Sequence, residues 1–167
     1  VIFLSGISMY FLVKRVSKSD QVSLLSSLSY IATPYFLTDI YVRCAFSEIF
    51  IFIFMPIVLR GIYELFYGKR QLFYFYFVTG YVGLMLSHLV LACYFTFIIL
   101  IILLFKVKEI MTDKKYKELI TASIIILCMT SFFYVPMIEH KLINKYVVFQ
   151  DSAMSSDKSM LLNQLSF

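Results

Sequence analysis

Three charged side chains, Asp39, Arg43 and Glu48, lie within ten residues between two long apolar stretches. A charge at the centre of a membrane helix costs about 2.5–3.5 kcal/mol on insertion scales, so this cluster needs either contact with water or a functional role. Asp39 and Arg43 are four residues apart and would share one helix face, where they can form an ion pair. Glu48 begins an apolar segment, where its carboxylate would complement the helix dipole or be held ionised by Arg43. The spacing thus leaves a structural ion pair and a functional site as alternatives.

The other polar candidates lie near the ends of apolar segments. His88, with Ser87, is the only strongly polar interruption of the 35-residue stretch Gln71–Phe105. A histidine there is either a turn residue at the level of the lipid headgroups or a group that binds a proton or a ligand. Tyr35 and Tyr41 are most simply tyrosines of the membrane interface. The sequence has no P-loop, dinucleotide fingerprint, zinc-protease motif or nucleophile elbow, so nucleotide-binding and soluble-hydrolase classes have no support.

Composition indicates a membrane protein. Of the 167 residues, 61% are hydrophobic and only 15% are charged, and the mean hydropathy is +0.87. Soluble domains carry about 25% charged residues. The net charge of +5 is too small and scattered to indicate a nucleic-acid partner. The three cysteines lack CxxC spacing and are expected to be free thiols. Because the chain starts inside an apolar run, we expect it to be a fragment of a longer protein.

The apolar segments predict an all-α, polytopic transmembrane bundle of about six spans, the first of them incomplete. A single helix over Gln71–Phe105 would be about 52 Å long against a hydrocarbon core of about 30 Å, so this stretch must fold back at Ser87–His88. We expect Pro34 and Pro56 to interrupt their segments and Pro136 to end the last span. The expected spans are residues 1–13, 21–37, 45–60, 71–87, 89–105 and 119–136, followed by an extracytoplasmic segment over 137–167.

Charge predicts the orientation in the cell membrane. If residues 21–37 cross the bilayer, 11 of the 15 basic residues fall on one side, which the positive-inside rule makes cytoplasmic. If that segment lay on the surface instead, the basic residues Lys14, Arg15 and Lys18 would be outside. The spanning interpretation fits the rule better. It delivers Asp39, Arg43, Glu48 and His88 to the extracytoplasmic face, where residues from separate loops can form one site.

A series of residues along the first half of the chain has a recognisable order. The series is Tyr30, Pro34, Tyr35, Asp39, Tyr41, Arg43 and Glu48, then Pro56 and Gly61, then Leu86, Ser87 and His88. It resembles the YfhO-like bacterial membrane proteins and the related group labelled 6-pyruvoyl-tetrahydropterin synthase-related. The soluble synthase binds zinc through three histidines. This chain has two histidines on an apolar framework, so the label does not describe its chemistry.

Such proteins are similar to GT-C-type glycosyltransferases, polytopic enzymes that take a sugar from a polyprenyl-phosphate carrier at the outer face. The resemblance implies that Asp39 or Glu48 is the general base for the acceptor hydroxyl, or a ligand of a divalent cation, while Arg43 binds the lipid phosphate. The implied substrate-binding residues are Arg43, His88, Tyr35 and Tyr41. The acid that these enzymes carry in their first outer loop has no counterpart here, so we expect the fragment alone to be inactive. The alternatives are a non-catalytic, flippase-like carrier of lipid-linked glycans and a structural membrane protein.

Overall fold

The computed structural model describes residues 1–143, with side chains through His140. Every regular element in this range is a helix, which confirms the all-α class. The helices are α1 (Ile2–Ser17), α2 (Asp20–Ile31), α3 (Pro34–Tyr41), α4 (Phe46–Tyr67), α5 (Arg70–Ser87), α6 (Leu89–Phe105), α7 (Val107–Thr112) and α8 (Tyr116–Ile143). Residues 1–130 form one compact unit, and the described residues from Ser131 onward belong to a separate one, so the boundary falls inside α8. Most of the expected segment 137–167 lies outside the described residues.

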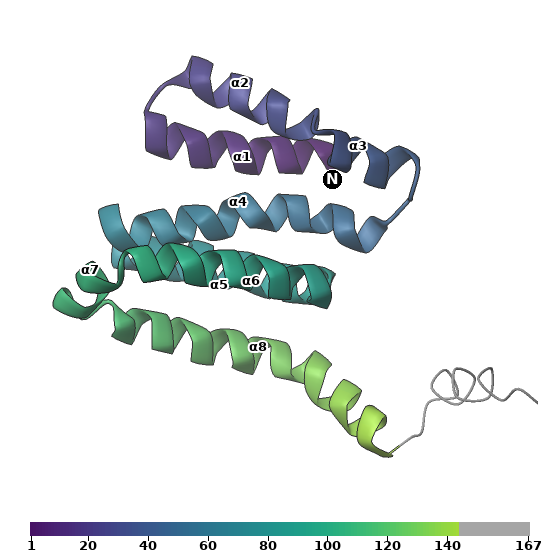
Figure 1. Cartoon of the computed structure of the whole chain (residues 1–167), viewed down its shortest axis with the longest axis vertical. Helices are drawn as coiled ribbons and strands as arrows, with labels where there is room; N and C mark the ends of the chain where they lie inside the picture. The colour runs from purple at the N-terminus through teal and green to yellow at the C-terminus, as the bar shows by residue number, and fades with distance from the viewer. Residues whose placement is uncertain (144–167) are drawn as a thin grey trace, which may run out of the picture. The chain divides into compact units, whose positions relative to one another are not determined.

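The first unit is built around the pair α4 and α5, with α1 on another side of α4 and α2 on α1 (Figure 1). Glycines let α4 and α5 approach closely. A Cβ atom on Gly61 would lie 2.6 Å from the backbone nitrogen of Phe77, and one on Gly80 would lie 2.8 Å from Val58. Helices in lipid have no hydrophobic driving force to associate. Small residues at their crossings let the backbones approach closely, so that van der Waals packing holds the helices together. Val58 and Phe73 are fully buried at this contact.

The chain reverses at His88, as the length of the apolar stretch predicts. Helix α5 ends at Ser87 and α6 begins at Leu89. The hydroxyls of Tyr81 and Thr96, which lie on opposite sides of this turn in the sequence, are hydrogen-bonded to each other, so the two helices run antiparallel. At the other end of α6, Lys106 Nζ donates to the Tyr67 hydroxyl at 3.1 Å. The carboxyl end of α6 therefore lies beside the carboxyl end of α4.

The segment predicted as the span 21–37 differs from expectation, because it is two helices. Helix α2 ends at Ile31, and α3 begins at Pro34 and continues to Tyr41. Thr33 is extended (φ −59°, ψ 130°), as expected before proline, whose ring disfavours the helical conformation of the preceding residue. Pro34 itself is the first residue of α3, a position where the missing N–H has no intrahelical partner to lose.

The predicted breaks at Pro56 and Pro136 are wrong, since α4 and α8 continue through both prolines. Pro56 cannot donate a hydrogen bond to the carbonyl of Phe52, one turn earlier. The Tyr30 hydroxyl of α2 donates to that carbonyl instead, at 3.0 Å. A neighbouring side chain thus satisfies the group that proline frees, which is how membrane helices tolerate proline. Consequently α4 extends to Tyr67, and Arg60 and Glu64 lie inside a helix rather than in a loop.

Within residues 1–143, two helical segments are long and apolar enough to cross a membrane, Phe46–Tyr67 and Tyr116–His140, and Leu89–Phe105 is a shorter apolar helix. Large apolar side chains on α6 and α8, such as Phe97, Leu127 and Phe132, are mostly exposed. An apolar surface of this extent suits contact with lipid. The full set of six spans and the sidedness of the loops stay predictions.

Candidate functional site

The corner between α3 and α4 brings four of the six predicted site residues together. After α3 ends at Tyr41, the backbone N–H of Arg43 donates to the carbonyl of Thr38 at 3.0 Å, and the N–H of Ala45 donates to the backbone carbonyl of Asp39 at 3.1 Å. Between them, Cys44 has a positive φ of 48°, an uncommon conformation for a residue other than glycine. Because the chain reverses tightly here, Glu48 in the first turn of α4 lies beside α3.

Arg43 joins two carboxylates at this corner. Its Nη1 donates to Asp39 Oδ1 and to Glu48 Oε2, each at 3.0 Å, and its Nη2 donates to Glu48 Oε1 at 3.0 Å. The Tyr35 hydroxyl donates to Glu48 Oε2 at 3.1 Å. Four of the predicted site residues, Tyr35, Asp39, Arg43 and Glu48, therefore form one hydrogen-bonded group, which we call the Arg43 cluster. The bidentate contact with Glu48 is the strong geometry for a guanidinium and a carboxylate.

The side chains of the Arg43 cluster differ in their exposure to solvent. The side chain of Asp39 is fully buried, that of Glu48 is 14% exposed, and that of Arg43 is 47% exposed. Within the described range, Asp39 Oδ2 has no hydrogen-bond partner. The Tyr35 hydroxyl, followed by the charge of Glu48, raises the pKa of Arg43, so the guanidinium remains charged. The Arg43 cluster thus joins two carboxyl groups through one guanidinium.

Aromatic packing holds α3 on α4 and so fixes the Arg43 cluster. Phe36 is fully buried, and its ring meets Phe52 of α4 edge-on at a centroid distance of 4.5 Å. The ring of Tyr35 lies 6.1 Å from the same residue. Edge-to-face pairs of this kind contribute about 0.5–1.5 kcal/mol beyond the area that they bury. Phe52 is therefore the anchor on which α3 presents Tyr35 and Asp39.

His88 and Tyr41 are not bonded into the Arg43 cluster. His88 is the N-cap of α6, and its Nδ1 accepts the N–H of Leu91 at 3.4 Å. The antiparallel register of α4 and α5, in which Gly61 faces Phe77 and Gly80 faces Val58, places His88 level with the first turns of α4. In residues 1–143, however, no hydrogen bond or ion pair links it to the three charged residues. Tyr41 is largely exposed at the end of α3.

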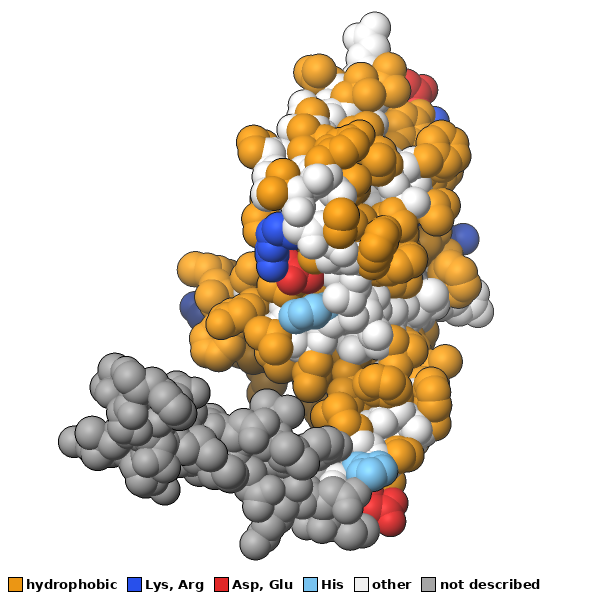
Figure 2. All heavy atoms as spheres, turned by 90° about the vertical axis from the view of Figure 1, so that its right-hand side faces the viewer, with side chains coloured by type: hydrophobic (Ala, Val, Ile, Leu, Met, Phe, Trp, Pro, Cys, Tyr) orange, Lys and Arg blue, Asp and Glu red, His pale blue; other side chains and the backbone are white. Residues whose placement is uncertain are grey.

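The surface around this corner is mainly apolar. Figure 2 looks onto the end of the molecule where α3 meets α4, and acidic and basic side chains adjoin one another there within a mostly hydrophobic surface. No group of three or more histidine, cysteine or acidic side chains that could hold a metal ion occurs among the described residues. Asp39 and Glu48 both pair with Arg43, so they do not form a divalent-cation site by themselves.

A second buried ion pair was not predicted. Arg15 of α1 donates from Nε to Glu64 Oε1 at 2.6 Å and from Nη2 to Oε2 at 3.1 Å. The side chain of Glu64 is fully buried, while that of Arg15 is 38% exposed. The sequence analysis placed both residues in loops, because the expected spans ended at residue 13, before Arg15, and at residue 60, before Glu64. The overlooked signal is that Glu64 follows Arg60 by one helical turn, which is compatible with a continued helix.

Comparison with known proteins identifies a family. A family described as 6-pyruvoyl-tetrahydropterin synthase related domain, a membrane protein, matches residues 1–158. No curated protein and no solved structure matches the chain. The matched range includes the whole Arg43 cluster and every helix described above.

Proposed function

This chain belongs to the 6-pyruvoyl-tetrahydropterin synthase related family of membrane proteins, and on that premise we propose that it is part of an integral membrane glycosyltransferase. Its donor is a sugar linked to polyprenyl phosphate, used at the outer leaflet. The observation that carries the proposal is the Arg43 cluster, in which a buried carboxylate oxygen without a partner lies beside a half-exposed guanidinium. Buried polar atoms without a partner are uncommon, and a catalytic role is one of the physical reasons for which a structure retains them.

The proposed reaction assigns each group one task. The acceptor hydroxyl oxygen forms a bond to the anomeric carbon of the sugar, and the bond between that carbon and the lipid phosphate breaks. Asp39 Oδ2 receives the hydroxyl proton, because Oδ1 is already held by Arg43. Arg43 stabilises the negative charge that develops on the departing polyprenyl phosphate. Its exposed edge suits this role, because a guanidinium has five N–H donors and three of them bond the carboxylates.

Glu48 and Tyr35 are positioning residues in this scheme. Glu48 grips two nitrogens of Arg43, and Tyr35 donates to Glu48, so the plane of the guanidinium is fixed before the phosphate arrives. Asp39 is covered in the described conformation. Binding of the phosphate to Arg43 would weaken the Arg43–Asp39 contact and let the acceptor approach Oδ2. No step is assigned to a metal ion, since the two acids alone do not suffice to hold one.

The test uses the full-length protein in proteoliposomes with a panel of radiolabelled polyprenyl-phosphate sugars. Asp39→Asn should lower sugar transfer by about 10²–10⁴-fold, the usual contribution of a general base, while donor binding persists. Arg43→Lys should weaken both donor binding and transfer, because lysine lacks the planar fork. Glu109→Gln is the matched control, since it makes the same kind of change at an ion-paired acid on α7.

Three outcomes separate the candidate functions. Sugar transfer by Asp39→Asn at the rate of the unaltered protein would refute the assignment of Asp39 as the general base. Loss of donor binding only in Arg43→Lys, without any sugar transfer by the unaltered protein, would identify a carrier of lipid-linked glycans. Unchanged donor binding in every variant, with a lowered unfolding temperature, would show that the Arg43 cluster only joins α3 to α4.

A further inference from the structure

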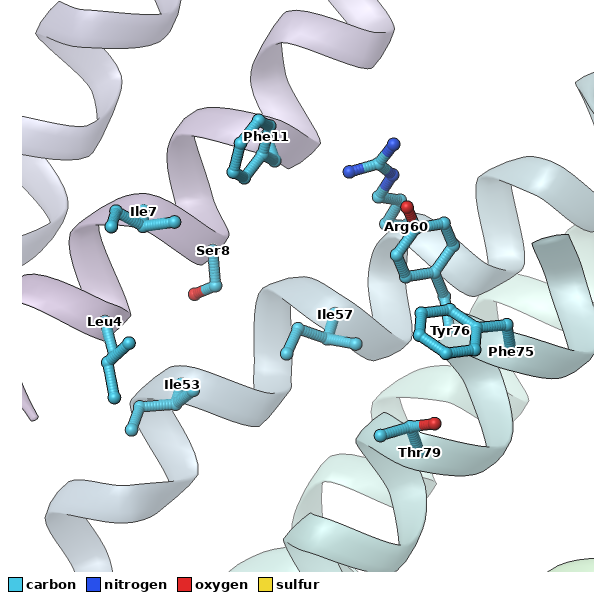
Figure 3. A pocket seen from close by; sticks show the side chains of 10 residues that line it. All are labelled: Leu4, Ile7, Ser8, Phe11, Ile53, Ile57, Arg60, Phe75, Tyr76 and Thr79. Carbon is cyan, nitrogen blue, oxygen red and sulfur yellow. The ribbon is translucent and has the colours of Figure 1, made fainter.

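A second candidate site lies between α1, α4 and α5. It is a cleft of about 480 Å³ whose walls are almost entirely apolar (Figure 3). The side chains that form these walls include Leu4, Ile7 and Phe11 of α1, Ile53 and Ile57 of α4, and Phe75 of α5. Along α1, the distance from Leu4 to Phe11 is about 10 Å at 1.5 Å per residue. The cleft can therefore take part of one hydrocarbon chain.

One cation, Arg60, borders this apolar cleft. Its guanidinium carbon lies 4.2 Å from the ring centre of Tyr76 and 5.9 Å from that of Phe11. Arg60 Nε is buried and has no hydrogen-bond partner in the part of the chain that the structure describes. The cation–π contacts fix the guanidinium without neutralising its charge. A positive charge next to an apolar cleft calls for a negative group.

The nearest acid on the same helix does not supply this negative group. Glu64 is one turn further along α4, but both of its carboxylate oxygens are bonded to Arg15, at 2.6 and 3.1 Å. No ion pair is formed by Arg60 among residues 1–140. Glu64 also attracts Arg60 at longer range, but one carboxylate faces two guanidinium groups, so one positive charge remains for a ligand outside the described chain.

We propose that this cleft binds an anionic phospholipid, with one acyl chain along the apolar walls and the phosphate on Arg60. The direction of the cleft agrees with such a ligand. Leu4 lies at one end, whereas Phe11 and Arg60 lie at the other, towards the end of the bundle that holds Arg15 and the α4–α5 turn. The headgroup would meet the basic end and the chain would point to the middle of the helices. A guanidinium binds phosphate oxygens in a bidentate manner, which favours a phosphate over other anions.

This lipid site does not depend on the proposed glycosyl transfer. The Arg43 cluster lies at the amino-terminal end of α4, and Arg60 lies more than three turns further along the same helix. A second protein copy is a poorer occupant than a lipid, because it would need an acidic side chain within an apolar surface. An amphipathic anion can pack its hydrocarbon chain on the apolar walls and pair its negative group with Arg60.

The chain contains no tryptophan, so a single introduced indole reports on one place. The full chain with Phe75→Trp is reconstituted in vesicles that contain dibrominated phosphatidylglycerol or, at the same fraction, dibrominated phosphatidylcholine. The bromine atoms quench the indole when the lipid occupies the cleft. Phe97→Trp, on the exposed apolar face of α6, is the control reporter and should be quenched equally by both lipids.

We expect phosphatidylglycerol to quench the Phe75→Trp reporter more strongly than phosphatidylcholine. Arg60→Gln should reduce this preference by about fivefold, the effect of one basic residue near an anionic lipid. Lys69→Gln removes the same charge at the exposed start of α5, outside the cleft, and should leave the preference unchanged. Ser8→Phe, which fills the cleft from α1, should lower quenching by both lipids.

Two results would overturn the proposal. Equal quenching by both lipids in the protein that retains Arg60 would do so, whatever the folding of the variants. An equal loss of preference in Arg60→Gln and Lys69→Gln would show that only the general charge of this end attracts the lipid. If Arg60→Gln fails to fold, Ser8→Phe and the comparison of the two lipids still decide the question.

Discussion

The contact between Tyr30 and the proline-interrupted turn of α4 gives the sharpest test of the fold. Pro56 leaves the Phe52 carbonyl without its helical donor, and the Tyr30 hydroxyl occupies that carbonyl at 3.0 Å. Tyr30→Phe removes the hydroxyl and keeps the ring. The carbonyl is then left unpaired in a partly buried position, which costs about 1–3 kcal/mol in proteins generally. Hydrogen bonds between membrane helices average about 0.6 and reach about 1.7 kcal/mol. We therefore expect a loss of about 1–1.5 kcal/mol in the free energy of unfolding.

The second half of the test is the same change in a Pro56→Ala background. Alanine at position 56 supplies the missing N–H, so the Phe52 carbonyl regains its partner one turn away. Tyr30→Phe should then cost only about 0–0.5 kcal/mol, and the two changes should be coupled by about 1 kcal/mol. Pro56 is fully buried, so Pro56→Ala has its own packing cost, but that cost cancels in the cycle.

The measurement is reversible unfolding of the four proteins in mixed micelles of a mild detergent and dodecyl sulfate, followed by circular dichroism. The free energy of unfolding is extrapolated to zero dodecyl sulfate for each protein. An equal cost of Tyr30→Phe in both backgrounds would refute the reasoning, because the hydroxyl would then not replace the donor that proline lacks.

Two further predictions concern the α4–α5 contact and the α7 corner. Gly61→Ala puts a Cβ atom 2.6 Å from Phe77 N, about 0.8 Å closer than ordinary contact. It should lower the free energy of unfolding by about 1–3 kcal/mol in the same micelle assay. Gly6→Ala is the control, because its Cβ would make ordinary contact at 3.5 Å, and it should be neutral or stabilising. The reasoning fails if both alanines have the same effect. Glu109 bonds Lys106 at 3.0 Å and Lys115 at 3.1 Å, and these lysines, Lys106 first, lower its pKa from 4.5. Because the folded pKa is lowered, the ion pairs stabilise the corner above pH 4.5, and this contribution disappears as the pH falls through the folded pKa. NMR titration of the Glu109 carboxyl should find a midpoint below 4.5 that Lys106→Gln raises; an unchanged midpoint would contradict the assignment.

Much of the local structure follows from the sequence. Long apolar segments and a low charge content predict helices in a membrane, and a stretch of 35 apolar residues is too long for one crossing, so the reversal at His88 was predictable. The spacing of Asp39 and Arg43 predicts a shared face, and the structure has their ion pair at 3.0 Å. The order of residues around them also indicated the family whose range covers residues 1–158. The roles of these residues in sugar transfer stay proposals.

Contacts between distant residues were decided only by the tertiary structure. Proline patterns predict breaks because an isolated helix loses a hydrogen bond there, but Tyr30 lies 22 residues from Phe52 and restores it. The ion pair of Glu64 with Arg15 was not predictable, because the two residues are 49 positions apart in the sequence. In the sequence, Arg60 is only one of the 11 basic residues that the positive-inside rule places on the cytoplasmic side. The cleft beside it exists only because α1 and α5 pack next to α4. Local periodicity determines which segments are helical, whereas the stability of a buried charge or a freed carbonyl depends on the side chain that packing brings to it.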